Sequence, residues 1–311
     1  MKLISSSQYR DVVMPRESLD GAEERVFAVT LEDVRLPDRQ PDTHKGDYGR
    51  LLIIAGSVGY TGAPALAARA ASRTGAGLVF LGVPNPVYNI MAAKLDEEMP
   101  FPLPADNFGR LGANAAGEIL RRAADCDALL IGPGLGTSKE LSELVMSIIR
   151  IVKAQIILDA DGINAIAGNA DVLDKAGRPV ILTPHMGEYN RLAGDIGTDR
   201  LNSSRGFATK YRCVLVLKGH RTITALPDGR AYINTTGGPA MAKGGSGDVL
   251  AGMIAAFAAQ KFSAKDAAAA AVFIHGLAGD MCSAGLGEYS VTASDIITML
   301  PTAMKRVAVQ D

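Results

Sequence analysis

The sequence predicts an α/β protein with a mainly parallel central sheet that carries helices on both faces. Three observations lead to this prediction. Short apolar runs recur along the chain, longer amphipathic segments separate them, and most of the glycine-rich segments follow an apolar run. Alternating buried strands and helices are typical of parallel sheets, in which ligands bind beyond the carboxyl ends of the strands.

Residues 1–40 form the first segment, which is charged and mixed and has no strong repeat. An arm, a short helix and an oligomer contact all fit this composition, so we predict only an N-terminal extension over 1–40. The alternating pattern begins near Gly46, and no linker long enough to divide the chain follows. We therefore expect a single domain over 41–311.

The apolar runs are continuous rather than alternating, which indicates strands buried on both faces. The six predicted strands cover 51–55, 78–83, 128–132, 155–159, 179–183 and 214–218. Amphipathic segments predict helices between them at 63–75, 114–124, 138–152 and 199–211. The stretch 221–234 then predicts two short strands joined by a PDG turn, and two alanine-rich helices follow at 249–260 and 264–285.

Composition excludes several classes of protein. The net charge of the 311 residues is -1, which gives no electrostatic case for nucleic acid or an anionic membrane. The three cysteines lie far apart, as reduced thiols in a cytoplasmic protein do. The start lacks a signal-peptide core, and the longest apolar run, 267–279, is too short to span a bilayer. We expect a cytoplasmic protein that binds neither nucleic acid nor membranes.

Two glycine-rich segments, GSVGYTGAP (56–64) and GPGLG (132–136), each follow a predicted strand. The first has the spacing GxxGxxG rather than GxGxxG, and no acid for a ribose follows the strand that ends at Val83, so it does not match the usual dinucleotide fingerprint. We favour a turn that lets a ligand approach the helix start, with plain turn geometry as the alternative. The second segment is either a tight turn or the backbone of a ligand pocket.

The third glycine-rich segment, TTGGPAMAKGGSGDVLAG (235–252), is the most informative. Small residues at 244–247 lead into a helix that begins near Asp248, and the unpaired N–H groups of a helix start suit a phosphate. The segment is not a Walker A loop. Asp248 could be a helix cap or an ordinary acid of the first turn, but its charge beside a phosphate site favours a base that deprotonates a hydroxyl attacking a phosphoryl group.

Other polar residues follow the predicted strands. Lys218 lies in LKGHRT (217–222), which could bind a nucleotide, although a solvated lysine is the simpler interpretation. His185 ends a strand in TPHMGE and is either a surface residue or part of a pocket wall. Asp159 and Asp161 in DADGIN could form an indirect Mg²⁺ site. The remaining histidines lack the spacing of metal ligands.

In chain order, KGDYGRLLIIAGSVGYTGAPALAARAASRTGAGL, IGPGLG, DADGIN, LTPHMGE, VLKGHRT and GGSGDVLAG resemble the motifs of NAD(P)H-hydrate dehydratases. These are ADP- or ATP-dependent repair enzymes of the ribokinase-like superfamily. The resemblance covers roughly 25–306 and implies a ribokinase-like fold. GGSGD alone would indicate only a ribokinase-like phosphoryl-transfer site, whereas KGDYGRLLIIAGS together with LTPHMGE is far more specific.

The resemblance implies roles for matching residues. Asp248 matches the catalytic acid/base residue, which contacts the hydrated nicotinamide, and Gly245, Ser246 and Gly247 match the anion hole. The residues that match nucleotide-binding positions are Lys218, Gly219, His220, Arg221, Thr222 and Gly247. The residues that match positions in contact with the hydrate are Ala63, Gly134, Gly136 and His185, in addition to Asp248.

The activity implied is ADP-dependent dehydration of (6S)-NADHX or NADPHX to NADH or NADPH, through phosphorylation of the ring hydroxyl, with AMP and phosphate as products. ATP is the alternative donor. The resemblance also implies Mg²⁺, a homotetramer and a separate epimerase, because the epimerase domain often fused in bacteria is not part of the sequence. Gly238, Ala240 and Lys243 stand where the family commonly has Asn, Gly and Thr, which bears on nucleotide preference.

Two other functions compete with this one. A ribokinase-like kinase for a vitamin precursor or a sugar would share GGSGD, but it needs a small closed pocket. A non-catalytic nucleotide sensor would have no need of Asp248 at a phosphate site.

Overall fold

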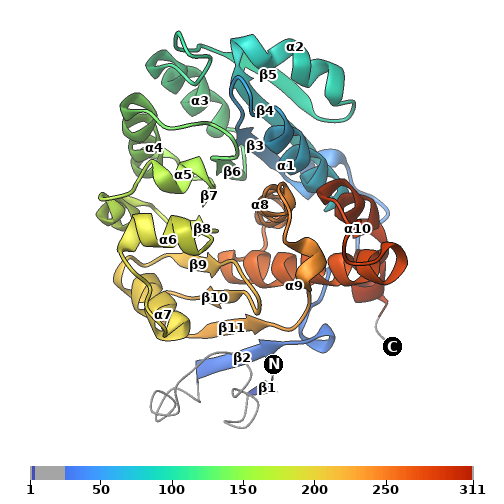
Figure 1. The fold of residues 1–311 in the computed structure, drawn as a ribbon. Helices are drawn as coiled ribbons and strands as arrows, with labels where there is room; N and C mark the ends of the chain where they lie inside the picture. The colour runs from blue at the N-terminus through green and yellow to red at the C-terminus, as the bar shows by residue number, and fades with distance from the viewer. Residues whose placement is uncertain (1, 4–24, 310–311) are drawn as a thin grey trace.

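The computed structural model describes residues 2–3 and 25–309, and within them the strands form one mostly parallel eleven-stranded sheet (Figure 1). The strand order is β1-β2-β11-β10-β9-β8-β7-β6-β3-β4-β5. Only the pairs β1/β2, β9/β10 and β10/β11 are antiparallel. The prediction of an α/β fold with a mainly parallel sheet is confirmed.

The strands are β1 (Lys2–Leu3), β2 (Val26–Val29), β3 (Arg50–Ile54), β4 (Leu78–Pro84), β5 (Met99–Leu103), β6 (Ala128–Ile131), β7 (Gln155–Leu158), β8 (Ile181–Leu182), β9 (Val214–Leu217), β10 (Ile223–Ala225) and β11 (Ala231–Asn234). The α-helices are α1 (Gly62–Arg73), α2 (Asn85–Lys94), α3 (Ala116–Ala123), α4 (Lys139–Ile151), α5 (Asp161–Asn164), α6 (Met186–Ala193), α7 (Arg200–Lys210), α8 (Ser246–Ala259), α9 (Ala264–Leu286) and α10 (Ala293–Ala308). Short 3-10 helices occupy Leu31–Asp33, Lys45–Tyr48, Ala113–Ala115, Ala170–Lys175 and Pro239–Met241.

Two apolar cores flank the sheet and explain why its strands are continuous apolar runs. Along β3, Leu51 and Ile53 face the core shared with α1, α8, α9 and α10, whereas Leu52 and Ile54 face the core shared with α3, α4, α6 and α7. All four side chains are fully buried. Figure 1 shows the two helix layers on opposite faces of the sheet, with α8 central in one of them.

Several observed elements were not predicted, and each has a physical reason. The edge strand β5 contains two prolines, which edge strands tolerate. The two prolines at 84 and 86 are typical of a turn. However, Pro86 lies in the first turn of α2, where proline is favoured. The start of α10 carries a capping box of Thr292 and Asp295, a signal that was available in the sequence.

The described part of the predicted N-terminal extension lies against the domain. Strand β2 pairs in parallel with β11, and Arg39 donates hydrogen bonds to the Gly75 carbonyl and to Gln260. Residues 1 and 4–24 lie outside the described residues. The division into an extension over 1–40 and a domain over 41–311 stays a prediction.

Helix α9 is long and apolar enough to cross a membrane by length and composition, the one such helix in the described residues. However, 67% of its apolar window is buried inside the protein. It packs against α8 and α10, so its hydropathy is that of a core helix.

Candidate active site

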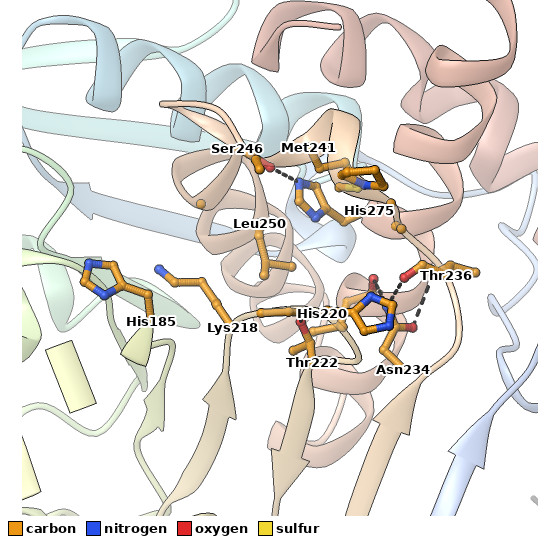
Figure 2. Close-up of a pocket in the computed structure, with 18 of the residues that line it drawn as sticks. His185, Lys218, His220, Thr222, Asn234, Thr236, Met241, Ser246, Leu250 and His275 are labelled. Carbon is orange, nitrogen blue, oxygen red and sulfur yellow. Dashed lines mark hydrogen bonds between the residues drawn. The ribbon is translucent and has the colours of Figure 1, made fainter. Parts of the chain in front are cut away.

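A cavity of about 810 Å³ lies beyond the carboxyl ends of β9 and β11, between the start of α8 and the middle of α9. Figure 2 shows its side chains converging from these elements. This is where ligands bind in open α/β sheets. The lining residues are His185, 218–222, Asn234, 236–239, 241–244, Ser246, Gly247, Leu250, Val272, His275 and Gly276. The cavity therefore brings together the predicted nucleotide segment and most of the predicted anion hole.

The start of α8 presents backbone N–H groups. Gly245 precedes the helix with a φ of +93°, and a Cβ there would press on Leu66 and Ala293, so glycine is required. Within the described residues, the backbone N–H groups of Gly247 and Asp248 have no hydrogen-bond partner. Unpaired N–H groups at a helix start are a binding site for an anion.

Asp248 lies in the first turn of α8 and is partly buried. The N-cap residue is Gly245, so Asp248 does not cap the helix; it is the acidic residue of the first turn, as the alternative interpretation expected. Burial first, and then the charge of Asp159, raise the pKa of Asp248 to about 7, while Lys218 acts in the opposite direction. A carboxyl group with this pKa can accept and release a proton near neutral pH.

Lys218 is held by buried carboxylates. Its Nζ lies 2.7 Å from Asp159 Oδ1 and 3.8 Å from Glu188 Oε2, and Thr183 donates a further hydrogen bond of 2.6 Å to Asp159. Burial alone would lower the pKa of Lys218, but the two carboxylates outweigh it and the pKa is raised. The alternative of a solvated lysine is therefore wrong. A Cβ on Gly247 would lie 3.3 Å from Lys218 Nζ. The ammonium group therefore lies beside residues 244–247, which we call the anion loop.

His185 is the N-cap residue of α6, and its side chain, which is 55% exposed, lines the cavity. Its Nδ1 accepts a hydrogen bond of 3.2 Å from the Glu188 backbone N–H, and its own backbone N–H donates to Glu188 Oε2 at 2.8 Å. His185 therefore caps a helix and also contributes to the pocket wall.

The predicted hydrate contacts Ala63, Gly134 and Gly136 lie together, outside the lining of the cavity. A Cβ on Gly134 would lie 3.4 Å from the Ala63 Cβ, and the Ser57 hydroxyl donates a hydrogen bond of 2.8 Å to the Gly134 carbonyl. The two glycine-rich segments at 56–64 and 132–136 thus pack against each other.

The two acids of DADGIN have separate partners. Asp159 binds Lys218 and Thr183, whereas Asp161 accepts a hydrogen bond of 2.8 Å from the Gly136 backbone N–H. Within the part of the chain that the structure describes, no group of three His, Cys, Asp or Glu residues could hold a metal ion. Asp159 and Asp161 as an indirect Mg²⁺ site therefore stay a prediction.

Two of the three atypical residues of the loop line the cavity. Gly238 and Lys243 lie at its wall, and Ala240 is buried. The ammonium group of Lys243 donates a hydrogen bond to the Tyr289 carbonyl in the loop after α9.

His275 is a lining residue that sequence reasoning missed. It comes from α9, and its Nε2 lies 3.3 Å from the Ser246 hydroxyl (Figure 2). Burial lowers the pKa of His275 to about 4, so the imidazole is neutral at pH 7. The feature of the sequence that could have pointed to this residue is a single histidine within a long alanine-rich run. The other lining residues not predicted are Asn234, Thr236, Gly237, Pro239, Met241, Ala242, Leu250, Val272 and Gly276.

Comparisons with known proteins identify relatives of this chain. A family model described as NAD(P)H-hydrate dehydratase matches residues 51–302. A bifunctional NAD(P)H-hydrate repair enzyme of Moorella thermoacetica is 43% identical over 277 residues, which are 88% of this chain and 52% of the relative. The chain thus spans about half the length of the curated relatives it matches.

Solved structures show the same fold. The ADP/ATP-dependent NAD(P)H-hydrate dehydratase of Bacillus subtilis, co-crystallised with ATP/Mg²⁺, is 32% identical with a TM-score of 0.78, covering 91% of this chain and 99% of that one. A ribokinase-like superfamily protein of Enterococcus faecalis is 30% identical with a TM-score of 0.78, covering 92% of this chain and 97% of that one.

Proposed function

Because the chain belongs to the NAD(P)H-hydrate dehydratase family, we propose that it repairs hydrated nicotinamide nucleotides by nucleotide-dependent dehydration. The substrates would be (6S)-NADHX and NADPHX, and the enzyme would be a hydro-lyase. The observation that carries the proposal is Asp248, a carboxyl group with a pKa of about 7, at a helix start where the backbone N–H groups of Gly247 and Asp248 are unpaired.

The reaction has two stages. The ring hydroxyl attacks the terminal phosphoryl group of the nucleotide, the new O–P bond forms, the anhydride bond breaks, and Asp248 accepts the hydroxyl proton. The electron pair of the ring nitrogen then expels phosphate, and loss of a proton from the neighbouring ring carbon restores the double bond. With ADP as the donor, the other product is AMP.

The remaining residues would bind and orient the reactants. The unpaired backbone N–H groups of Gly247 and Asp248, in the turn that also contains Gly245 and Ser246, would hold the transferred phosphoryl group, and the segment 218–222 would hold the rest of the nucleotide. Lys218 would place a positive charge beside that group while it neutralises Asp159. We assign the hydrate to the glycine-rich segments that carry Ala63, Gly134 and Gly136, with His185 at the cavity wall as a further contact.

Mg²⁺ fits this site as an ion carried by the nucleotide. Asp159 and Asp161 already have hydrogen-bond partners, and Mg²⁺ commonly keeps water and phosphate oxygens as ligands. The loop at 244–247 would hold the ion indirectly, through the phosphates. When bound, it would supply positive charge to the transferred group. The Bacillus subtilis structure with ATP/Mg²⁺ supports this expectation.

We propose ADP as the donor, with ATP as the alternative. We further propose a cytoplasmic homotetramer that works alongside an epimerase for the other epimer of the hydrate. The names of the curated relatives, which describe bifunctional repair enzymes, are consistent with a second repair activity in the same process.

The test is recovery of the absorbance of reduced nicotinamide from NADH hydrate, with purified protein, Mg²⁺ and either ADP or ATP. Recovery that depends on one nucleotide, with equimolar release of phosphate, is the expected result and identifies the donor. No recovery with either nucleotide, from protein that still binds nucleotide, would contradict the proposal and favour a ribokinase-like kinase for another hydroxyl substrate.

A further inference from the structure

His275 and Gly276, the first two residues of the segment HGLAGD (275–280) on α9, line the cavity, although the sequence of this segment suggests only a core helix. Gly276 and Gly279 let the helix approach the loop that lines the cavity. A Cβ on Gly276 would collide with Thr236, and one on Gly279 would collide with the Met241 side chain. Glycine inside a helix costs stability, so this close approach is the reason for both residues.

Hydrogen bonds fix the loop to α9 on either side of these glycines. The Thr236 hydroxyl donates to the Phe273 carbonyl at 2.8 Å, and the Gly237 backbone N–H donates to Asp280 Oδ2 at 2.9 Å. The backbone around His275 is therefore held at a fixed distance from the cavity.

His275 reaches from this wall to the anion loop. Its Nε2 and the Ser246 hydroxyl form a hydrogen bond of 3.3 Å between residues that are 7% and 8% exposed. Burial keeps the imidazole neutral, since the pKa of His275 is lowered to about 4. In the tautomer that carries its hydrogen on Nε2, the neutral imidazole donates to the Ser246 oxygen and leaves the hydroxyl hydrogen free to donate to a second acceptor.

We propose that His275 is a positioning residue that fixes the Ser246 hydroxyl in the orientation in which it contacts the transferred phosphoryl group. The inference rests on the proposed function. A free hydroxyl rotates among three staggered positions, and a donor acts on a transition state only in the right one. His275 selects that position before the nucleotide arrives.

Two matched variants separate positioning from packing. His275→Leu keeps most of the volume and removes the hydrogen bond, whereas His275→Gln keeps a polar group near the place of Nε2. Both residues are good helix formers, so helix propensity does not distinguish them. We expect kcat of His275→Leu to fall about tenfold and His275→Gln to recover most of it. The calorimetric Kd for ADP should stay within about twofold in both, because the contact acts on the phosphoryl group in transit.

A double-mutant cycle with Ser246→Ala completes the test. If His275 acts through the hydroxyl, Ser246→Ala lowers kcat as much as His275→Leu does, and the double variant loses no more than either single variant. If the leucine variant does not fold, His275→Met, which also lacks the hydrogen bond, takes its place in the cycle and should add nothing to the loss of Ser246→Ala. Additive losses, or equal activity of the glutamine and leucine variants, would overturn the proposal.

The proposed function and this inference fail differently. A wild-type protein that binds nucleotide but regenerates NADH with neither ADP nor ATP removes the proposed function. A wild-type protein that regenerates NADH, together with a His275→Leu variant of unchanged kcat, removes only the role of His275.

Discussion

At the scale of single residues, the site depends on one acid placed where a phosphate is expected. Asp248 has no hydrogen-bond or ion-pair partner among the described residues, and burial, followed by the charge of Asp159, raises its pKa. Lys218 is the nearest compensating charge and is already paired with Asp159. A stabilising acid would have a partner, so the arrangement is that of a group kept for proton transfer.

The pKa of Asp248 makes activity depend on pH. The base must be ionised to accept a proton, and its pKa is about 7. We expect kcat/KM to rise about tenfold per pH unit below that value and to level off above it. A pH–rate profile that is flat from about pH 5 to 8 would contradict the role of Asp248 as the base.

The raised pKa of Asp248 also makes the stability of the folded protein depend on pH. The folded-state pKa of about 7 exceeds the model-compound value of 3.8, so the native state holds the proton more tightly than the unfolded state. Stability therefore falls as pH rises from about 4 to 7, and the full cost remains above that range. Asp248→Asn removes the cost, and we expect it to increase the free energy of unfolding at pH 8 by about 1–3 kcal/mol. Denaturant titrations at pH 8 and pH 4 check this, with the gain absent at the lower pH.

Gly247 controls access to the anion loop. A valine there would bring its side chain against Lys218, whose Nζ lies 3.3 Å from the position of a Cβ, and would occupy the approach of the phosphates. We expect Gly247→Val to weaken ADP binding at least about tenfold in calorimetry. Unchanged affinity would mean that the phosphates bind elsewhere.

At the scale of elements, the strands and most of the helices that build the site could be predicted from the sequence. Strands buried on both faces appear as continuous apolar runs. The sequence did not reveal that α9 lines the cavity, since its lining residues are spaced among apolar ones and their role depends on tertiary approach. The glycine loops were located correctly, but the buried pairing of Lys218 with Asp159 joins residues 59 positions apart and could not be inferred.

The packing of α8 on α1 makes a testable contribution to stability. A Cβ on Gly252 would collide with the backbone carbonyl of Ala67, which cannot move aside. We expect Gly252→Ala to reduce the free energy of unfolding by about 1–3 kcal/mol. Gly206 in the exposed part of α7 is the matched control, because nothing lies within 4 Å of its Cβ position. Gly206→Ala should raise stability by about 0.5–1 kcal/mol. Equal effects of the two substitutions would argue against close contact of α8 and α1.

At the scale of the whole molecule, one sheet carries both halves of the proposed site. The β9–β11 end supplies the nucleotide cavity, and the β3/β6 end supplies the glycine loops, with α8 between them (Figure 1). Nucleotide binding should therefore stabilise the entire domain. At ADP about 100 times above Kd, the free energy of unfolding should rise by about 2.7 kcal/mol as one cooperative transition. A second transition that ADP leaves unmoved would show independent units.

The most direct test of the account is Asp248→Asn, measured for both ADP affinity and dehydration of NADH hydrate. We expect a Kd within about threefold of the wild-type value and a loss of kcat of at least about 100-fold, because only the base is removed. Dehydration retained at near the wild-type rate would contradict the account, since the acid at the start of α8 would then not carry the chemistry.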